Sequence, residues 1–327
     1  MISGLAGKKI VIVIPVFDDW ESFGSLVEEI GRSVDFGLHK VSVVAVDDCS
    51  SNAADLSALN ARRGKLSKVG LVRLASNLGP MRAIAVGLVV ANETEDPDAV
   101  IVMDADGEDQ PCDIARLLSE WDAGPQRIVV ARRAERSEGQ MFKFFYGVYK
   151  RAFRLLVGKS ISFGNFCLLP REALSILVHT PAIWNNLPAA IIRSRIPYSQ
   201  LDTKRGQRIA GKSSMNFVSL SVHGVSAISV FTDLVLLRLA VAMGVIAAAT
   251  LLGLMIVIAI KFGTNWAIPG WASYVGGSLV IIFFQTVLFA VVMLIQVLSL
   301  RSLKTFLPIL DARAFILSQQ LNPNDNI

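Results

Sequence analysis

The sequence has few of the residues that build disulfide frameworks, zinc sites and catalytic triads. Its three cysteines, Cys49, Cys112 and Cys167, lie far apart and form no C-x-x-C pair. Neither a disulfide framework nor a zinc site is therefore indicated. Three scattered histidines disfavour a histidine-based metal site or triad. A G-x-G-x-x-G loop does not follow the first apolar run, so phosphate must be bound by metal and basic side chains instead.

Charge and hydropathy narrow the class of protein further. The net charge of +5 is modest and spread along the chain, which does not indicate a nucleic-acid partner. Hydrophobic residues make up 53% of the chain, a high share for a soluble protein, and the surplus lies after about residue 230. The N-terminus has no long apolar core followed by a cleavage site, so we expect no signal peptide and a cytoplasmic catalytic part.

Strand-like apolar runs alternate with helical patterns through the first half of the chain. This alternation predicts an α/β fold with a Rossmann-like, mostly parallel sheet covered by helices on both faces. Ligands of such sheets bind beyond the carboxyl ends of the strands. The predicted strands cover residues 8–15, 41–46, 69–74, 99–103 and 127–131, and the clearest helices cover about 20–34 and 81–91. A further helix is expected to begin within residues 47–52, a group rich in N-cap residues.

Acidic side chains follow three of the first four predicted strands. They are Asp18-Asp19, Asp47-Asp48 and the pair Asp104 and Asp106. Alternate residues of a strand share a face, so Asp104 and Asp106 could converge on one point. Mg²⁺ and Mn²⁺ take oxygen ligands and keep positions for substrate phosphates, so this pair suits a cation that neutralises a leaving diphosphate. The alternative is a solvated acidic loop after a buried strand.

Basic side chains that could contact phosphate follow the fifth predicted strand and recur some 70 residues later. They are Arg132, Arg133, Arg136, Lys204, Arg205, Arg208 and Lys212. Residues 141–157 form a basic amphipathic pattern, which is typical of a helix in a membrane interface. An ordinary helix packed on its own sheet would give the same pattern.

Two long uncharged segments near the C-terminus predict transmembrane helices. Residues 239–260 and 274–300 carry no charge and are long enough to cross a bilayer. Basic residues flank the pair on its outer ends and are scarce in the connector, so the positive-inside rule predicts cytoplasmic N- and C-termini. We expect a catalytic domain at 1–213, an amphipathic juxtamembrane segment at 214–233, a transmembrane hairpin at 234–302 and a C-terminal tail at 303–327.

Six segments of the chain form an ordered set of motifs: residues 13–19, 46–50, 77–79, 104–109, 164–166 and 205–213. Together, and in this order, they resemble family-2 glycosyltransferases of the polyprenyl-phosphate type, which have the GT-A fold. The similarity extends to dolichyl-phosphate mannose synthases and bacterial undecaprenyl-phosphate glucosyltransferases. It implies inverting, Mg²⁺- or Mn²⁺-dependent transfer of a sugar from a nucleotide-diphosphate sugar to a polyprenyl phosphate at the bacterial inner membrane.

The resemblance also implies roles for individual residues. The nucleotide pocket would contain Pro15, Phe17, Asp19, Asp47, Asp48 and Asn77. Asp104, Asp106 and Glu108 would contact the metal, and Asp104, Asp106, Arg132 and Asn165 would form the catalytic centre. The phosphates and the acceptor would meet Arg132, Arg205, Arg208, Lys212 and Ser213.

The chain departs from the family pattern in several places. Asp18-Asp19 replaces Asn-Glu, Glu108 replaces Gln, Met81 and its neighbours do not match Lys-Glu, and Asn165 replaces the Asp of Gly-Asp-Phe. An essential base at position 165 would be lost in this chain. A phosphate monoester has a second pKa of about 6, however, so the acceptor is already largely dianionic and needs positioning more than deprotonation. We therefore expect an active enzyme.

Three alternatives stay open at this point. The chain could be a glycosyltransferase with another acceptor, a catalytically silent membrane scaffold, or a nucleotide-sugar sensor. A flippase is disfavoured because two spans cannot easily enclose a polar path. Gln285, Gln296 and the Gly276-Gly277 pair could serve a homo-oligomer, or simply the contact between the two spans.

Overall fold

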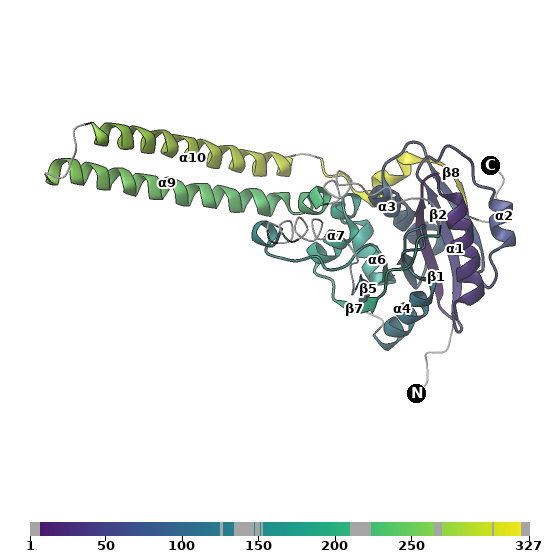
Figure 1. The fold of residues 1–327 in the computed structure, drawn as a ribbon. Helices are drawn as coiled ribbons and strands as arrows, with labels where there is room; N and C mark the ends of the chain where they lie inside the picture. Colours follow the sequence, from purple (N-terminus) through teal and green to yellow (C-terminus); the bar gives the residue numbers. More distant parts are fainter. Residues whose placement is uncertain are drawn as a thin grey trace. The chain divides into compact units, whose positions relative to one another are not determined.

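The described residues of the computed structural model are 7–124, 127–133, 147, 151, 153–209, 224–264, 270–302 and 304–321. They divide into two compact units (Figure 1). The first unit takes its residues from 1–146, 161–230 and 305–327, and the second from 147–160 and 231–304.

The first unit is built on a mixed sheet, whose strand order in the described part of the chain is β7-β5-β6-β4-β1-β2-β3-β8. β4, β1, β2 and β3 run parallel, as do β5 and β7, whereas β6 is antiparallel to both its neighbours and β8 to β3. The predicted mostly parallel sheet is confirmed, and the five predicted strands match β1 to β5 within two residues. The bounds are β1 (Lys9–Val16), β2 (Lys40–Asp47), β3 (Val69–Leu74), β4 (Ala99–Val102), β5 (Ile128–Arg133), β6 (Cys167–Pro170), β7 (Tyr198–Thr203) and β8 (Ile316–Gln320).

Helices cover both faces of this sheet. Ile12, Ile14 and the other inward residues of β1 share a core with α1 (Trp20–Ser33) and α4 (Pro111–Ala123), while α2 (Leu56–Ala61) lies beside β3. On the opposite face α3 (Pro80–Val90) approaches closely, since a Cβ on Gly87 would lie 2.5 Å from Val13 Cγ1. Around α3 pack the π-helix η1 (Ala91–Glu95), α6 (Arg171–Val178) and η2 (Pro181–Trp184), followed by α7 (Leu187–Ser194).

The prediction that a helix begins within residues 47–52 was wrong. The helix begins at Leu56, where Asp55 is the N-cap and accepts a hydrogen bond from Ala58 N (2.9 Å). The earlier polar residues instead bond to the loop after β1, because Ser51 N and Ser50 Oγ both pair with Asp18.

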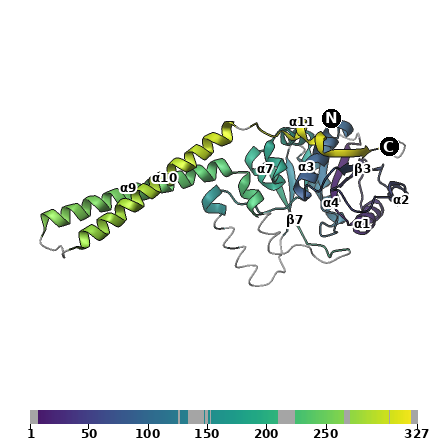
Figure 2. The same cartoon turned by 90° about the horizontal axis from the view of Figure 1, so that it is seen from above.

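The C-terminal segment returns to the first unit and extends its sheet. Figure 2 shows β8, in yellow, beside β3. The helical turns α11 (Pro308–Asp311) and η3 (Ala312–Phe315) precede β8, and the ring of Trp184 lies 4.3 Å from that of Phe306 and 5.2 Å from that of Phe315. Residues 305–321 are therefore an integral part of the first unit.

The second unit is a pair of long antiparallel helices, α9 (Thr232–Gly263) and α10 (Trp271–Ser302), packed against each other. Both are long and apolar enough to cross a membrane, with mean hydropathies of 2.6 and 2.7 over 18-residue windows. Only 17% and 6% of those windows are buried, whereas a core helix of a soluble protein would be mostly buried. At ~1.5 Å per residue, each helix exceeds the ~30 Å hydrocarbon core.

The end of the predicted basic amphipathic helix also belongs to the second unit. Phe153 stacks edge-on against Phe231 at 6.2 Å, and Arg238 Nη1 donates to the carbonyl oxygens of Leu155 and Leu156. Most of residues 141–152 and 210–223, on which the two amphipathic predictions rest, lie outside the described residues.

Candidate active site

Three acidic loops meet at the carboxyl edge of the parallel strands. In the sheet register Val16 pairs with Asp47 and Val13 with Val102, so β1, β2 and β4 end close together. Two backbone hydrogen bonds extend this alignment into the loops, from Asp48 N to Val16 O and from Met103 N to Val13 O. The predicted convergence of these loops at one edge is confirmed.

The end of β1 and the loop after it carry three of the predicted nucleotide contacts. Asp18, which has a positive φ of 50°, connects this loop to the loop after β2, because its Oδ1 accepts a hydrogen bond from Ser51 N (2.7 Å). Pro15 and Asp19 are half-buried beside it, and the ring of Phe17 is 52% exposed. An exposed aromatic ring at this edge offers a stacking surface for a base.

The adjacent carboxylates Asp47 and Asp48 have different surroundings. Asp48 accepts hydrogen bonds from Leu78 N (2.7 Å) and Gly79 N (2.8 Å), so it holds the loop that contains exposed Asn77. Burial raises the pKa of Asp48, and the two N–H groups oppose that rise. Asp47 Oδ1 accepts from Ser50 N, whereas Oδ2 is buried, makes no hydrogen bond in the described structure and lies 3.4 Å from Arg73 Nε.

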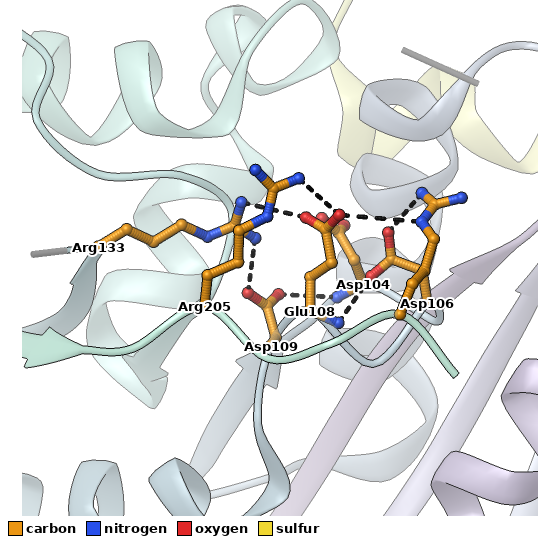
Figure 3. Close-up of polar contacts among 7 residues, drawn as sticks. Asp104, Asp106, Glu108, Asp109, Arg133 and Arg205 are labelled. Atoms are coloured by element: carbon orange, nitrogen blue, oxygen red, sulfur yellow. Dashed lines mark hydrogen bonds and ion pairs between the residues drawn. The ribbon is translucent and has the colours of Figure 1, made fainter. Parts of the chain in front are cut away.

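The loop after β4 forms the centre of a carboxylate–arginine cluster (Figure 3). Asp109 is buried, and its Oδ2 accepts a hydrogen bond from Asp104 N (3.1 Å). Arg133 joins this pair to Glu108, because its guanidinium lies 3.1 Å from Asp109 Oδ1 and 3.3 Å from Glu108 Oε2. The cluster comprises Asp104, Asp106, Glu108, Asp109, Arg133, Arg205 and Arg208.

Residues 204–209, here called the closing segment, lie over the acidic loop. Arg205 Nη2 donates to Glu108 Oε1 (2.6 Å), and Arg208 Nη2 donates to Asp106 Oδ2 (2.7 Å). Gly206 N and Ile209 N donate to the backbone oxygens of Glu108 and Asp106. Gly107 has φ +82°, a backbone conformation that favours glycine, and a Cβ there would also lie 2.6 Å from Ile209 Cγ1.

Residues 206–213 match the letters G-x-x-x-x-G-K-S of a phosphate-binding loop. Such a loop cradles phosphate with free backbone N–H groups between a strand and a helix. In this chain the N–H groups of Gly206 and Ile209 are already bonded to the acidic loop. The described half of the match therefore acts as part of the closing segment, and the predicted contacts Lys212 and Ser213 lie outside the described residues.

The cluster shifts the pKa values of two of its own carboxyl groups in opposite directions. Burial, and then the charges of Asp109 and Asp106, raise the pKa of Asp104 to about 7, against the opposing effects of Arg133 and of a hydrogen bond from the Asn165 side chain. Burial would also raise the pKa of Glu108, but Arg205, Arg133 and Arg208 together hold it below its ordinary value. Glu108 is therefore an anion at neutral pH.

Of the predicted catalytic residues Asn165 and Arg132, only the first contacts the carboxylate–arginine cluster. Asn165 reaches the cluster through its hydrogen bond to Asp104. Arg132 does not, because it pairs with Asp202 on the adjacent strand β7, Nε to Oδ1 at 2.6 Å and Nη2 to Oδ2 at 2.9 Å. Its neighbour Arg133 enters the cluster instead, since successive strand residues face opposite ways.

The donor set suits a hard divalent cation in part. Asp104 and Asp106 supply carboxylate oxygens in the loop after β4, and such oxygens are ligands that a hard divalent cation prefers. Glu108, the third predicted metal ligand, forms ion pairs with Arg133 and Arg205 instead. The described residues contain no group of three acidic, histidine or cysteine side chains arranged to hold a metal. Arg208 already donates to Asp106 Oδ2, so a cation bound through that oxygen would compete with this contact.

Residues 11–175, half of the chain, match the model of glycosyl transferase family 2, and the chain belongs to that family. It is thus an α/β enzyme of the transferase class with a GT-A fold and two C-terminal helices that could span a membrane.

Among characterised proteins, the chain is similar to a bactoprenol glucosyl transferase of Shigella phage SfX, with 27% identity over 68% of this chain and 73% of the relative. It is also 27% identical to an undecaprenyl-phosphate 4-deoxy-4-formamido-L-arabinose transferase of Yersinia enterocolitica, over 80% of this chain and 79% of the relative. Both relatives are, by name, polyprenyl-phosphate glycosyltransferases.

Among solved structures, the fold is similar to that of glucosyl-3-phosphoglycerate synthase from Mycobacterium tuberculosis, crystallised with Mn²⁺, UDP-glucose and phosphoglyceric acid. The TM-score is 0.50 at 15% identity, covering 70% of this chain and 80% of that one. Identity at this level supports the shared fold alone.

Proposed function

We propose that this protein transfers a sugar, with inversion, from a nucleotide-diphosphate sugar to a polyprenyl phosphate in a divalent-cation-dependent reaction. The observation that carries the proposal is the carboxylate–arginine cluster at the carboxyl edge of a GT-A sheet, in a chain that continues into an apolar helical hairpin. The two named relatives that act on bactoprenol or undecaprenyl phosphate support the choice of acceptor.

In the proposed reaction, an oxygen of the acceptor phosphate attacks the anomeric carbon. The bond from that carbon to the donor's diphosphate breaks, and its electron pair leaves on the nucleoside diphosphate. A cation bound at Asp104 and Asp106 would neutralise charge on this leaving group. Arg133, Arg205 and Arg208 supply fixed positive charge near the same phosphates, which lowers the barrier through electrostatic preorganisation. No protein base is needed, because a phosphate acceptor is largely dianionic at neutral pH.

We further propose that the nucleotide base binds over Phe17 and reaches Asp47. The exposed ring of Phe17 and the buried Oδ2 of Asp47 support this placement. Pro15, Asp19 and Asn77 would complete the pocket, whereas Asp48 would support it from behind by holding residues 78–79.

A membrane-spanning hairpin would bring the first unit to a substrate that is confined to the bilayer. Both of its ends connect to residues of the first unit, which supports an even number of crossings and one side of the membrane for both. Arg238 and Arg301 lie near the ends of α9 and α10 that adjoin the first unit, and Lys304 and Arg313 follow α10. At the opposite end of the hairpin, Lys261 in the last turn of α9 is the basic residue among those described. By the positive-inside rule, this distribution supports a cytoplasmic position for the first unit at a bacterial inner membrane.

The test is release of nucleoside diphosphate by the purified full-length protein across a panel of UDP- and GDP-sugars, with and without undecaprenyl phosphate and with and without Mg²⁺ or Mn²⁺. Release that requires one sugar, the lipid and a cation supports the proposal. Release with the lipid omitted, or with a soluble phosphate acceptor, would indicate a different acceptor. Binding of a nucleotide sugar without any turnover would support the sensor alternative.

A further inference from the structure

Glu108 is the residue that connects all three arginines of the carboxylate–arginine cluster. Its Oε1 lies 2.6 Å from Arg205 Nη2 and 3.8 Å from Arg208 Nε, and its Oε2 lies 3.3 Å from Arg133 Nη1. The Glu108 side chain is only 13% exposed, so solvent screens these ion pairs less than it would at the surface.

The described cluster is close to charge balance without any ligand. Four carboxylates face three guanidinium groups, and every one of those guanidiniums has a carboxylate oxygen within 3.1 Å. A diphosphate that approaches this cluster meets arginines whose charge is already neutralised from within. A cation that takes Asp106 would release Arg208 and add positive charge at the same time.

We propose that Glu108 makes capture of the donor's diphosphate conditional on the divalent cation. The carboxylate is an internal counter-ion that occupies the guanidiniums until a cation on Asp104 and Asp106 shifts the balance toward an anionic ligand. The inference rests on the proposed function, and it assigns Glu108 a positioning and specificity-determining role rather than that of a metal ligand.

The substitution Glu108→Gln isolates this role. Glutamine keeps the length and an acceptor oxygen but removes the charge, so the arginines keep a hydrogen-bond partner and lose their counter-ion. With one carboxylate charge fewer beside them, the three guanidiniums should attract an anion more strongly in the absence of a cation, while the proposed cation site loses a nearby negative charge. The affinities for the anion and for the cation should therefore change in opposite directions. If Glu108 had a merely structural role, its substitution would weaken the binding of both.

The experiment is titration calorimetry on the full-length protein in detergent, with inorganic pyrophosphate alone, Mn²⁺ alone and both together. For Glu108→Gln we expect pyrophosphate without metal to bind about tenfold more tightly than to wild type, and Mn²⁺ alone to bind several-fold more weakly. Metal-free pyrophosphate binding that is unchanged or weaker overturns the proposal. Should this variant fail to fold, Glu108→Ser carries the same expectation.

The matched control is Glu93→Gln. Glu93 also pairs with an arginine, Arg313, at 2.7 Å, but it lies outside the cluster, so both affinities should stay at wild-type values. Sugar transfer by the wild-type protein is measured on the same preparation. If wild type transfers sugar and Glu108→Gln shows no crossed shift, only the Glu108 inference fails. If wild type is inactive, the proposed function fails while the crossed shift still reports on Glu108.

Discussion

Arg208 donates a hydrogen bond to Asp106 Oδ2 over 2.7 Å, at the carboxylate expected to hold the cation. The two residues are 102 positions apart and are brought together by the closing segment. A cation bound through this oxygen would therefore compete with Arg208. Such competition would distinguish an arginine that only binds phosphate from one that also controls access to the proposed metal site.

The first prediction follows from this pair. Arg208→Gln should tighten Mn²⁺ binding by about tenfold, because Asp106 loses its competing partner, and should lower kcat/KM by about 100-fold, because the phosphates lose a positive charge. Calorimetry and steady-state kinetics on one preparation measure both. A fall in Mn²⁺ affinity would show that Arg208 supports the cation site rather than competing for it.

The second prediction uses the adjacent arginines of β5. Arg133 contacts Asp109 and Glu108, whereas Arg132 pairs with exposed Asp202. Arg133→Gln should lower kcat/KM by about 100-fold, and Arg132→Gln by less than about threefold, since an exposed pair contributes little. Equal losses from the two substitutions would contradict the placement of the cluster.

The third prediction concerns the different roles of Asp47 and Asp48, the two carboxylates at the end of β2. Asp48→Ala leaves two backbone N–H groups without their acceptor, so it should destabilise the fold by about 2–4 kcal/mol. Asp47→Asn should instead raise the KM for the donor by about tenfold and leave thermal stability near wild type. Thermal unfolding and donor titration measure these effects. A stability loss confined to Asp47→Asn would reverse the assignment.

The fourth prediction concerns pH. The pKa of Asp104 is raised to about 7, so the folded, metal-free protein holds this proton more tightly than the unfolded chain does. Ionisation of Asp104 therefore costs stability, and that cost grows as pH rises from about 4 to about 7. Asp104→Asn removes it. The Tm of Asp104→Asn relative to wild type should accordingly increase between pH 5 and pH 8 in the presence of a chelator. A constant or decreasing difference would contradict the raised pKa.

The fifth prediction tests the attachment of the C-terminal segment. The ring of Phe306 lies 4.3 Å from that of Trp184, so Phe306→Ala should destabilise the first unit by about 1–3 kcal/mol. Phe262→Ala is the control, because that ring is 80% exposed on α9 and should leave the unfolding of the first unit unchanged. Equal unfolding midpoints for the two variants would show that the aromatic contact adds nothing.

The sequence predicts much of the fold, for identifiable reasons. β1, β2 and β4 are largely buried apolar runs, β3 is apolar apart from Arg73, and α9 and α10 contain long uncharged stretches, so each carries its own signal. β7 (Tyr198–Thr203) and β8 (Ile316–Gln320) are edge strands that alternate between half-buried and more exposed residues, and β8 pairs with a strand more than 240 positions away. Nothing local predicts such a pairing.

The site was predictable at the level of loops but not of individual contacts. The acidic loops could be expected to meet, because parallel strands share a carboxyl edge. Which arginine of β5 enters the cluster depends on strand register, and the sequence alone did not distinguish Arg132 from Arg133. Asp48 holds residues 78 and 79, whereas Asp47 accepts from Ser50 N and lies beside Arg73, and only the folded chain brings these residues together.

The most direct test of the account is detection of the glycosylated lipid itself. Purified wild type and Asp106→Ala would each be incubated with the preferred nucleotide sugar, Mn²⁺ and undecaprenyl phosphate, and the lipid extract analysed by mass spectrometry. We predict a sugar–phosphate–polyprenol product that requires the cation and falls by about 100-fold or more in Asp106→Ala. An equal yield from both proteins, or transfer only to a soluble acceptor, would contradict the assignment of the site or of the acceptor.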